Sequence, residues 1–196
     1  MMHRQEAART LAAALTDQLL VTGLGNAAFD MYVAGDRALN FYTRGGMGTA
    51  TSIAFGLARA RPNDRVVCVE GEGSLLMNLG SLATIGRYAP RNLACFIFDN
   101  QRYQITGGQP THTGAGVDLA VVARGCGIAS AALVESLDEF KALLPRVLDA
   151  PGPHVVVAKV DDARAQGYQP RRTVLLKYRF MGRLGTLPDL AALAWE

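Results

Sequence analysis

The chain has 196 residues, 49% of them hydrophobic, so it is long enough to bury one sizeable core and too apolar to be disordered. Its net charge of +3 is too small to indicate a nucleic-acid-binding surface by itself. Three cysteines, Cys68, Cys95 and Cys126, fall in apolar runs without a Cys-x-x-Cys pair, which favours buried reduced thiols. We see neither a signal peptide nor an apolar run long enough to span a membrane, and therefore expect a cytoplasmic protein.

The first third of the chain predicts short strands and helices joined by glycine-rich loops. Helices are expected over residues 4–17, 27–33 and 52–60, and strands over residues 19–21 and 40–42. The loop after the first strand carries Gly23, Leu24 and Gly25, and its glycines permit a ligand to approach the backbone closely, although a plain turn would look the same. In the loop at residues 43–50, Met47 lies between Gly46 and Gly48, a position that helix packing does not explain.

The centre of the chain reads as one βαβ unit. A strand over residues 65–70 leads into Gly71-Glu72-Gly73-Ser74, a helix is expected over residues 75–88, and a strand over residues 92–98 ends at Asp99-Asn100. Both polar groups follow strands of a parallel pair, at the edge where open α/β sheets bind ligands. Glycines at a helix start admit an anion, and the Glu72 carboxylate and the Asn100 amide oxygen suit a Mg²⁺ ion that holds a diphosphate.

The remaining elements complete a doubly wound α/β fold. Residues 101–113 form a polar loop in which His112 is as consistent with a solvated position as with a catalytic one. Helices are expected over residues 117–125 and 136–150, the second with a Ser136–Glu139 capping box, and strands over residues 129–134 and 154–160. We therefore predict a mostly parallel six-stranded sheet with helices on both faces.

Residues 161–196 break this pattern and form a basic tail after the domain at residues 1–160. Six basic residues alternate there with aromatic ones, as in some nucleic-acid-binding segments. Because the net charge is weak, we expect no nucleic acid and favour an arm that packs on the domain or on a partner subunit.

The combined pattern resembles the diphosphate-binding domain of thiamine diphosphate-dependent 2-oxo acid decarboxylases. Those enzymes carry Gly-Asp-Gly-Ser after one strand and an Asn at the end of the next, where this chain has Gly-Glu-Gly-Ser and Asn100. More narrowly, residues 19–113 look like the beta subunit of sulfopyruvate decarboxylase and the C-terminal half of phosphonopyruvate decarboxylase. Two departures are Glu72 in place of Asp, whose extra methylene moves the carboxylate outward, and Asp99 in place of a frequent Asn.

The resemblance implies roles for particular residues. Mg²⁺ would be bound by Glu72, by Asn100 and by the backbone oxygen of Arg102. The thiamine diphosphate would be bound by Gly23, Leu24, Gly25, Gly45, Gly46, Met47, Gly71, Gly73, Ser74 and Tyr103. Met47 would be the apolar wedge that bends the cofactor and allows it to deprotonate itself, which makes it a candidate catalytic residue. His112 is the second candidate, because of its position in the polar loop.

The resemblance also implies a partner and a substrate. In such enzymes a glutamate on a separate pyrimidine-binding domain activates the cofactor, and 196 residues leave no room for that domain. We therefore expect a beta-type subunit that joins a pyrimidine-binding alpha subunit in an α2β2 or larger hetero-oligomer. The expected substrate is a small 2-oxo acid, with 3-sulfopyruvate, converted to sulfoacetaldehyde and CO₂, ahead of phosphonopyruvate. Its acid group would need donors such as Arg44, Arg102, His112 or the tail arginines.

Three other functions are compatible with parts of the pattern. A carboligase would use the same cofactor to join the bound aldehyde to a second carbonyl compound. A non-catalytic scaffold or regulatory domain could retain the fold, and Glu72 is the one feature in its favour. A nicotinamide-binding domain is disfavoured because no Gly-x-Gly-x-x-Gly follows the first strand.

Overall fold

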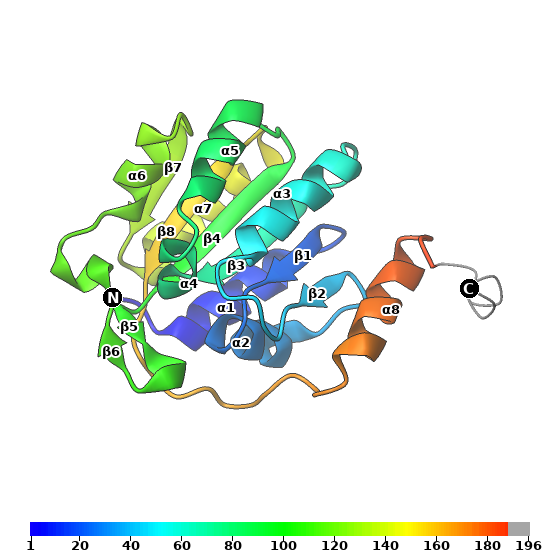
Figure 1. The fold of residues 1–196 in the computed structure, drawn as a ribbon, viewed down its shortest axis with the longest axis horizontal. Helices are drawn as coiled ribbons and strands as arrows, with labels where there is room; N and C mark the ends of the chain where they lie inside the picture. Colours follow the sequence, from blue (N-terminus) through cyan, green and yellow to red (C-terminus); the bar gives the residue numbers. More distant parts are fainter. Residues whose placement is uncertain (188–196) are drawn as a thin grey trace.

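A computed structural model describes residues 1–187 and shows a central parallel sheet covered by helices on both faces (Figure 1). All neighbouring strands of the sheet are parallel. In spatial order they are β2 (Asn40–Tyr42), β1 (Leu19–Thr22), β3 (Val66–Gly71), β4 (Leu93–Asp99), β8 (His154–Lys159) and β7 (Ser130–Val134). The central strands are continuous apolar runs because helices cover both of their faces. The predicted doubly wound six-stranded fold is therefore confirmed.

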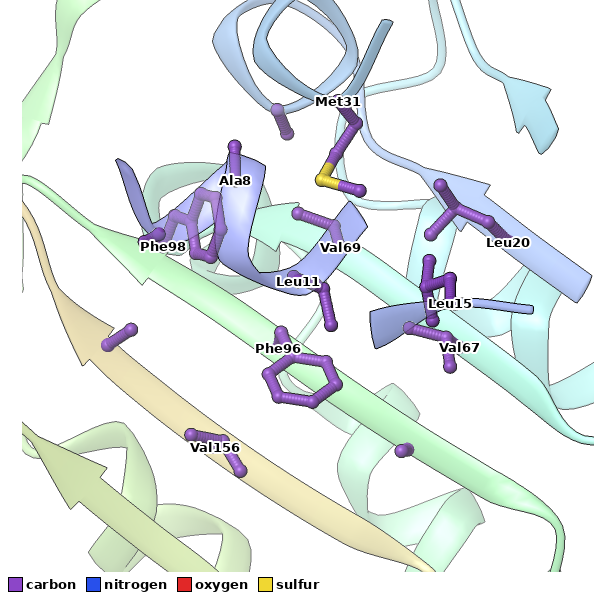
Figure 2. Packing of buried hydrophobic residues seen from close by; sticks show 14 of the residues in the cluster. Ala8, Leu11, Leu15, Leu20, Met31, Val67, Val69, Phe96, Phe98 and Val156 are labelled. Carbon is purple, nitrogen blue, oxygen red and sulfur yellow. The ribbon is translucent and has the colours of Figure 1, made fainter. Parts of the chain in front are cut away.

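The two faces of the sheet carry separate hydrophobic cores. One core packs helices α1 (Arg4–Ala14), α2 (Asn26–Gly35) and α7 (Leu137–Asp149) against one set of strand side chains. Figure 2 shows this layer, in which Leu11 and Met31 of the helices lie over Val69 and Phe96 of the strands. The opposite face holds α3 (Ala50–Ala60), α4 (Glu72–Leu76), α5 (Gly80–Tyr88) and α6 (Leu119–Gly125). Alternate residues of each strand point into alternate cores.

The strand order places a topological switch between β1 and β3. The chain leaves β1 through α2 to reach β2, and it then returns through α3 to β3 on the other side of β1. The helices that follow β1 and β3 therefore lie on opposite faces, which opens a crevice at the carboxyl ends of these strands. Gly23, just beyond β1, donates its N–H to the Val69 carbonyl of β3 and ties the two strand ends together at 2.6 Å.

Three segments differ from the sequence-based expectation. The helix expected at residues 75–88 is divided into α4 and α5, and the side chain of Asn78 in the intervening turn donates to the Gly48 carbonyl at 2.8 Å. The helix expected at residues 4–17 ends at Ala14 because Leu15 is extended. The polar loop after β4 contains a hairpin and two short 3₁₀ turns, namely β5 (Arg102–Tyr103), η1 (Gln104–Thr106), β6 (Gln109–Pro110) and η2 (His112–Ala115).

The segment after β8 passes along the edge that carries the hairpin and then forms helix α8 (Thr173–Arg183) beside β2 (Figure 1). Arg179 of α8 forms two hydrogen bonds with Asp36, at 2.6 and 2.7 Å, and Phe180 contacts Phe41 with ring centroids 5.6 Å apart. The boundary at residue 160 and the partner-binding role of the tail stay predictions, and residues 188–196 lie outside the described part.

Two further findings concern expectations from composition. All three cysteines are free thiols; Cys68 and Cys95 are buried as expected, whereas Cys126 is only half-buried because it lies in the turn after α6. Among residues 1–187, no helix combines the length and the apolarity needed to cross a lipid bilayer.

Candidate cofactor and metal site

A pocket opens at the switch point, where the carboxyl ends of β1, β3 and β4 meet; we call it the switch-point pocket. It contains about 680 Å³ of space outside protein atoms, including the open solvent at its mouth. Its walls come from α1, from the loops after β1, β2 and β3, and from the hairpin after β4. The lining residues are Arg4, Leu24, Asn26, Ala27, Met47, Gly71, Glu72, Gly73, Ser74, Phe98, Asn100, Arg102, Tyr103, Gln104, Ile105 and Thr106.

Glu72 brings a buried carboxylate to the floor of this pocket. It is the first residue of α4 and only 2% exposed, and it accepts a hydrogen bond from the Thr111 hydroxyl at 2.9 Å. Burial, and secondly the nearby Asp99 carboxylate, raise the pKa of Glu72 to about 7. Within residues 1–187, no Lys, Arg or His pairs with it.

Asn100 presents its amide beside Glu72 through a strained turn. Gln101, the next residue, has a φ of 62°, which is uncommon for a residue with a side chain and occurs most often at functional sites. The Asn100 Nδ2 group donates to Gln104 Oε1 at 3.1 Å, and Asn100 Oδ1 accepts from the Arg102 N–H at 3.0 Å. This orientation leaves the second lone pair of the amide oxygen available to a metal ion.

These groups fit the Mg²⁺ ion and the diphosphate that the sequence predicts. A divalent cation beside Glu72 would offset the cost of a buried charge, and oxygen ligands of this kind suit Mg²⁺. Nowhere in residues 1–187, this pocket included, do three His, Cys, Asp or Glu residues converge as a metal site, so a cation here would depend on amide, carbonyl and phosphate oxygens as well. The three expected protein ligands are the Glu72 carboxylate, the Asn100 amide oxygen and the Arg102 backbone carbonyl. They would leave the other coordination positions of Mg²⁺ to phosphate oxygens and water, which is how this ion is usually bound.

The Met47 loop is fixed to the start of α4 by a buried hydrogen-bond chain. Ser74 Oγ accepts from the Gly48 N–H at 2.8 Å and donates to Glu70 Oε1 at 2.5 Å, and the other Glu70 oxygen accepts from the Thr51 N–H at 3.0 Å. The Ser74 hydroxyl therefore positions the loop, and the Ser74 backbone N–H, in the first turn of α4, is the group left for an anion. Met47 reaches the pocket and is 37% exposed.

Gly73 is required by a close contact with Tyr103. A Cβ atom at residue 73 would lie 2.6 Å from a ring carbon of Tyr103, which real contacts do not allow. Gly71 has open space at the same position. The tyrosine ring and the glycine turn therefore form one wall of the pocket.

A buried ion pair from the first helix supports the same wall, and sequence reasoning missed it. Arg4 and Asp30 are 2% and 3% exposed and lie 2.5 Å apart, and burial raises the pKa of Asp30. Arg4 also donates to Gln104 Oε1 at 2.8 Å, and the same oxygen accepts from Asn26 at 2.5 Å and from Asn100. Gln104 thus joins the N-terminal helix to the expected metal ligand. Its position in the polar loop was the only signal available in the sequence.

The structure brings most of the predicted site residues together. Leu24, Met47, Gly71, Glu72, Gly73, Ser74, Asn100, Arg102 and Tyr103 line the switch-point pocket. It does not bring Gly23, Gly25, Gly45, Gly46 or His112 to that lining. Gly25 lines a neighbouring pocket, and His112 is exposed in η2. The catalytic role of His112 and the individual cofactor contacts stay predictions.

Comparison with known proteins identifies the family. The family "Thiamine pyrophosphate enzyme, C-terminal TPP binding domain" matches residues 23–158. Sulfopyruvate decarboxylase subunit beta of Methanocaldococcus jannaschii is 40% identical over 84% of this chain and 87% of the relative. Phosphonopyruvate decarboxylase of Streptomyces viridochromogenes is 40% identical over 76% of this chain and 37% of the relative.

The fold of this chain is also similar to that of a protein whose structure has been solved. A Mycobacterium smegmatis protein, provisionally assigned as a thiamin diphosphate-dependent enzyme, superposes with a TM-score of 0.69 at 26% identity, covering 82% of this chain and 32% of that one. The family match at residues 23–158 includes every residue that lines the switch-point pocket except Arg4. This chain therefore belongs to the thiamine pyrophosphate-dependent enzymes, in the group of decarboxylase chains that includes the sulfopyruvate decarboxylase beta subunits.

Proposed function

We propose that this chain is the beta-type subunit of a thiamine diphosphate- and Mg²⁺-dependent decarboxylase that converts 3-sulfopyruvate to sulfoacetaldehyde and CO₂. The observation that carries the proposal is Glu72, a buried carboxylate without a cationic partner in the described chain, beside Asn100 at the switch point. The relatives named as sulfopyruvate decarboxylase beta subunits support the substrate. Phosphonopyruvate is the second candidate substrate, because relatives that decarboxylate it are similarly close.

In this proposal, the residues around the switch-point pocket bind the metal, bind the diphosphate or hold the cofactor in its bent conformation. Glu72, Asn100 and the Arg102 carbonyl hold Mg²⁺, and the free N–H groups at the start of α4 face the diphosphate. The bound cofactor supplies the carbanion and the electron sink for loss of CO₂. Met47 supports the cofactor in its bent conformation, and Phe98 and Ile105 keep the cleft apolar. Ser74 and Glu70 hold the Met47 loop against α4.

A partner subunit completes the proposed active site. Among the residues that the structure describes, Glu72 is the only glutamate that lines the switch-point pocket, and it is assigned to the metal, so the proposal assigns the glutamate that activates the pyrimidine ring to a partner chain. Met47 is exposed at the mouth of the pocket, where a second chain can cover the cofactor. The relatives' designation as beta subunits supports an alpha subunit that binds the pyrimidine, in an α2β2 or larger assembly.

The direct test is reconstitution with the partner. The tagged full chain is purified from its native cells with thiamine diphosphate and Mg²⁺, and the co-purified chain is identified by mass and then mixed with wild-type or variant protein. We expect Mg²⁺-dependent release of CO₂ and sulfoacetaldehyde from 3-sulfopyruvate, lost in Asn100→Ala and retained in the exposed-turn control Asn63→Ala. A ligated hydroxyketone product would indicate a carboligase instead. Failure to bind the cofactor with the partner present would favour a non-catalytic domain.

A further inference from the structure

A second pocket adjoins the switch-point pocket, and we call it the arginine pocket. Leu24 and Ile105 line both pockets, so the two spaces meet at these side chains. Arg44 and Arg171 are the charged residues of the second lining, which includes no carboxylate. In the part of the chain that the structure describes, neither guanidinium has an ion-pair partner. The pocket therefore carries two uncompensated positive charges.

The other walls of the arginine pocket are mostly apolar. Phe29 and Tyr168 meet edge to face with ring centroids 4.8 Å apart, and both line the pocket. The Ile105 side chain lies against the backbone of Gly25, where an added Cβ would approach it to 2.9 Å. Both arginines are exposed, and the apolar walls shield an anion in this pocket from water on one side, which strengthens its attraction to the guanidinium groups relative to a fully open surface.

The arginine pocket is also lined by a residue with a buried, unpartnered oxygen, Gln169. Gln169, two residues before Arg171, is 5% exposed and lines the pocket. Its Nε2 group donates to the Thr43 carbonyl at 3.2 Å, and its buried Oε1 has no hydrogen-bond partner among the described residues. A buried acceptor without a partner requires an explanation. A guanidinium N–H drawn into the pocket by an anion would satisfy it.

We propose that the arginine pocket binds the second acid group of the substrate, a sulfonate or phosphonate, while the 2-oxo acid end lies in the switch-point pocket. This inference rests on the proposed function. A tetrahedral group with three oxygens matches the planar donor arrays of two guanidinium groups, which bind such anions through charge-assisted hydrogen bonds. Arg44 comes from the same loop as Met47, and Arg171 from the segment after β8, so substrate recognition uses the tail as well as the domain.

Substrate selectivity in the reconstituted complex tests this assignment. Arg44→Gln and Arg171→Gln are compared with the control Arg172→Gln, an exposed neighbour that lines neither pocket. We expect each pocket variant to raise the KM for 3-sulfopyruvate by about 10- to 100-fold, the loss typical of a charged hydrogen bond. The kcat/KM for pyruvate, which lacks the second acid group, and the affinity for thiamine diphosphate should change by less than about twofold. Equal losses for both substrates, or an equal loss in the control, overturn the proposal.

A binding experiment separates this inference from the proposed function. Sulfoacetate, which cannot be decarboxylated at a 2-oxo group, is titrated into the full chain and followed by ligand-observed NMR. Binding that disappears in Arg44→Gln and Arg171→Gln supports the pocket even if the complex has no decarboxylase activity. Absence of sulfoacetate binding to the wild-type chain overturns the pocket, whereas absence of thiamine diphosphate binding in the reconstituted complex overturns the proposed function. Loss of alpha-subunit association in the arginine variants, read by gel filtration, would reassign the arginines to the interface.

Discussion

Replacing Glu72 with Gln is expected to stabilise the metal-free chain at pH 8 and to remove its response to Mg²⁺. The wild-type carboxylate is buried beside Asp99 without a cationic partner in residues 1–187, so its charge is costly until a metal binds. Glutamine keeps the size of the side chain and an oxygen that can accept the hydrogen bond from Thr111, but it carries no charge.

The size of the effect follows from the pKa of Glu72. A folded-state pKa raised from 4.5 to about 7 gives a stabilising contribution that is fully present below about pH 4.5 and lost as the pH rises through 7. The loss amounts to about 3 kcal/mol of unfolding free energy at pH 8, because each pKa unit corresponds to about 1.4 kcal/mol. Glu72→Gln should therefore match wild type near pH 4.5 and exceed its stability by up to about 3 kcal/mol at pH 8.

Urea unfolding measures this difference in the presence of EDTA at several pH values, with the exposed Glu135→Gln as the charge-matched control. The titrations are then repeated with thiamine diphosphate and Mg²⁺ at about 100 times the dissociation constant, which should stabilise wild type by about 3 kcal/mol and leave Glu72→Gln unchanged. Glu72→Gln that is less stable than wild type at pH 8, or that retains the full Mg²⁺-dependent stabilisation, would refute the reasoning.

Three further substitutions test the remaining parts of the site. Arg4→Leu should destabilise the chain by about 3 kcal/mol in urea unfolding, because it leaves Asp30 buried without its cation, and Arg4→Leu with Asp30→Leu should recover most of that loss. Gly73→Ala should weaken thiamine diphosphate binding by at least about tenfold in calorimetry, since the new Cβ displaces the Tyr103 ring. The control Gly80→Ala, which has open space at its Cβ, should leave the affinity for thiamine diphosphate unchanged. Met47→Ala should lower kcat by at least about tenfold with little change in cofactor affinity, because it removes the support for the bent cofactor; equal changes in both quantities would contradict that role.

Local sequence patterns were sufficient to predict the strands and to place Glu72 and Asn100 in one pocket. The apolar runs before Gly71 and Asp99 are typical of buried strands, and the carboxyl ends of parallel neighbours lie at the same edge of the sheet, so Glu72 and Asn100 were expected together. The prediction of one helix over residues 75–88 was wrong at residues 77–79, because the helical spacing of apolar residues continues there although the chain forms a turn. That turn exists because the Asn78 side chain binds the Gly48 carbonyl, and a contact over 30 residues leaves no local pattern.

The sequence by itself determined the family and the parallel sheet, because these depend on local periodicity and on a motif within one βαβ unit, and it predicted that Glu72 and Asn100 lie at one sheet edge. Only the tertiary structure decided that Arg4 pairs with Asp30 and supports Gln104, that Gly73 faces the Tyr103 ring, and that Arg44 and Arg171 share a pocket. Those contacts join segments from distant parts of the chain. Their energies arise from burial and charge at sites that exist only after the sheet has assembled.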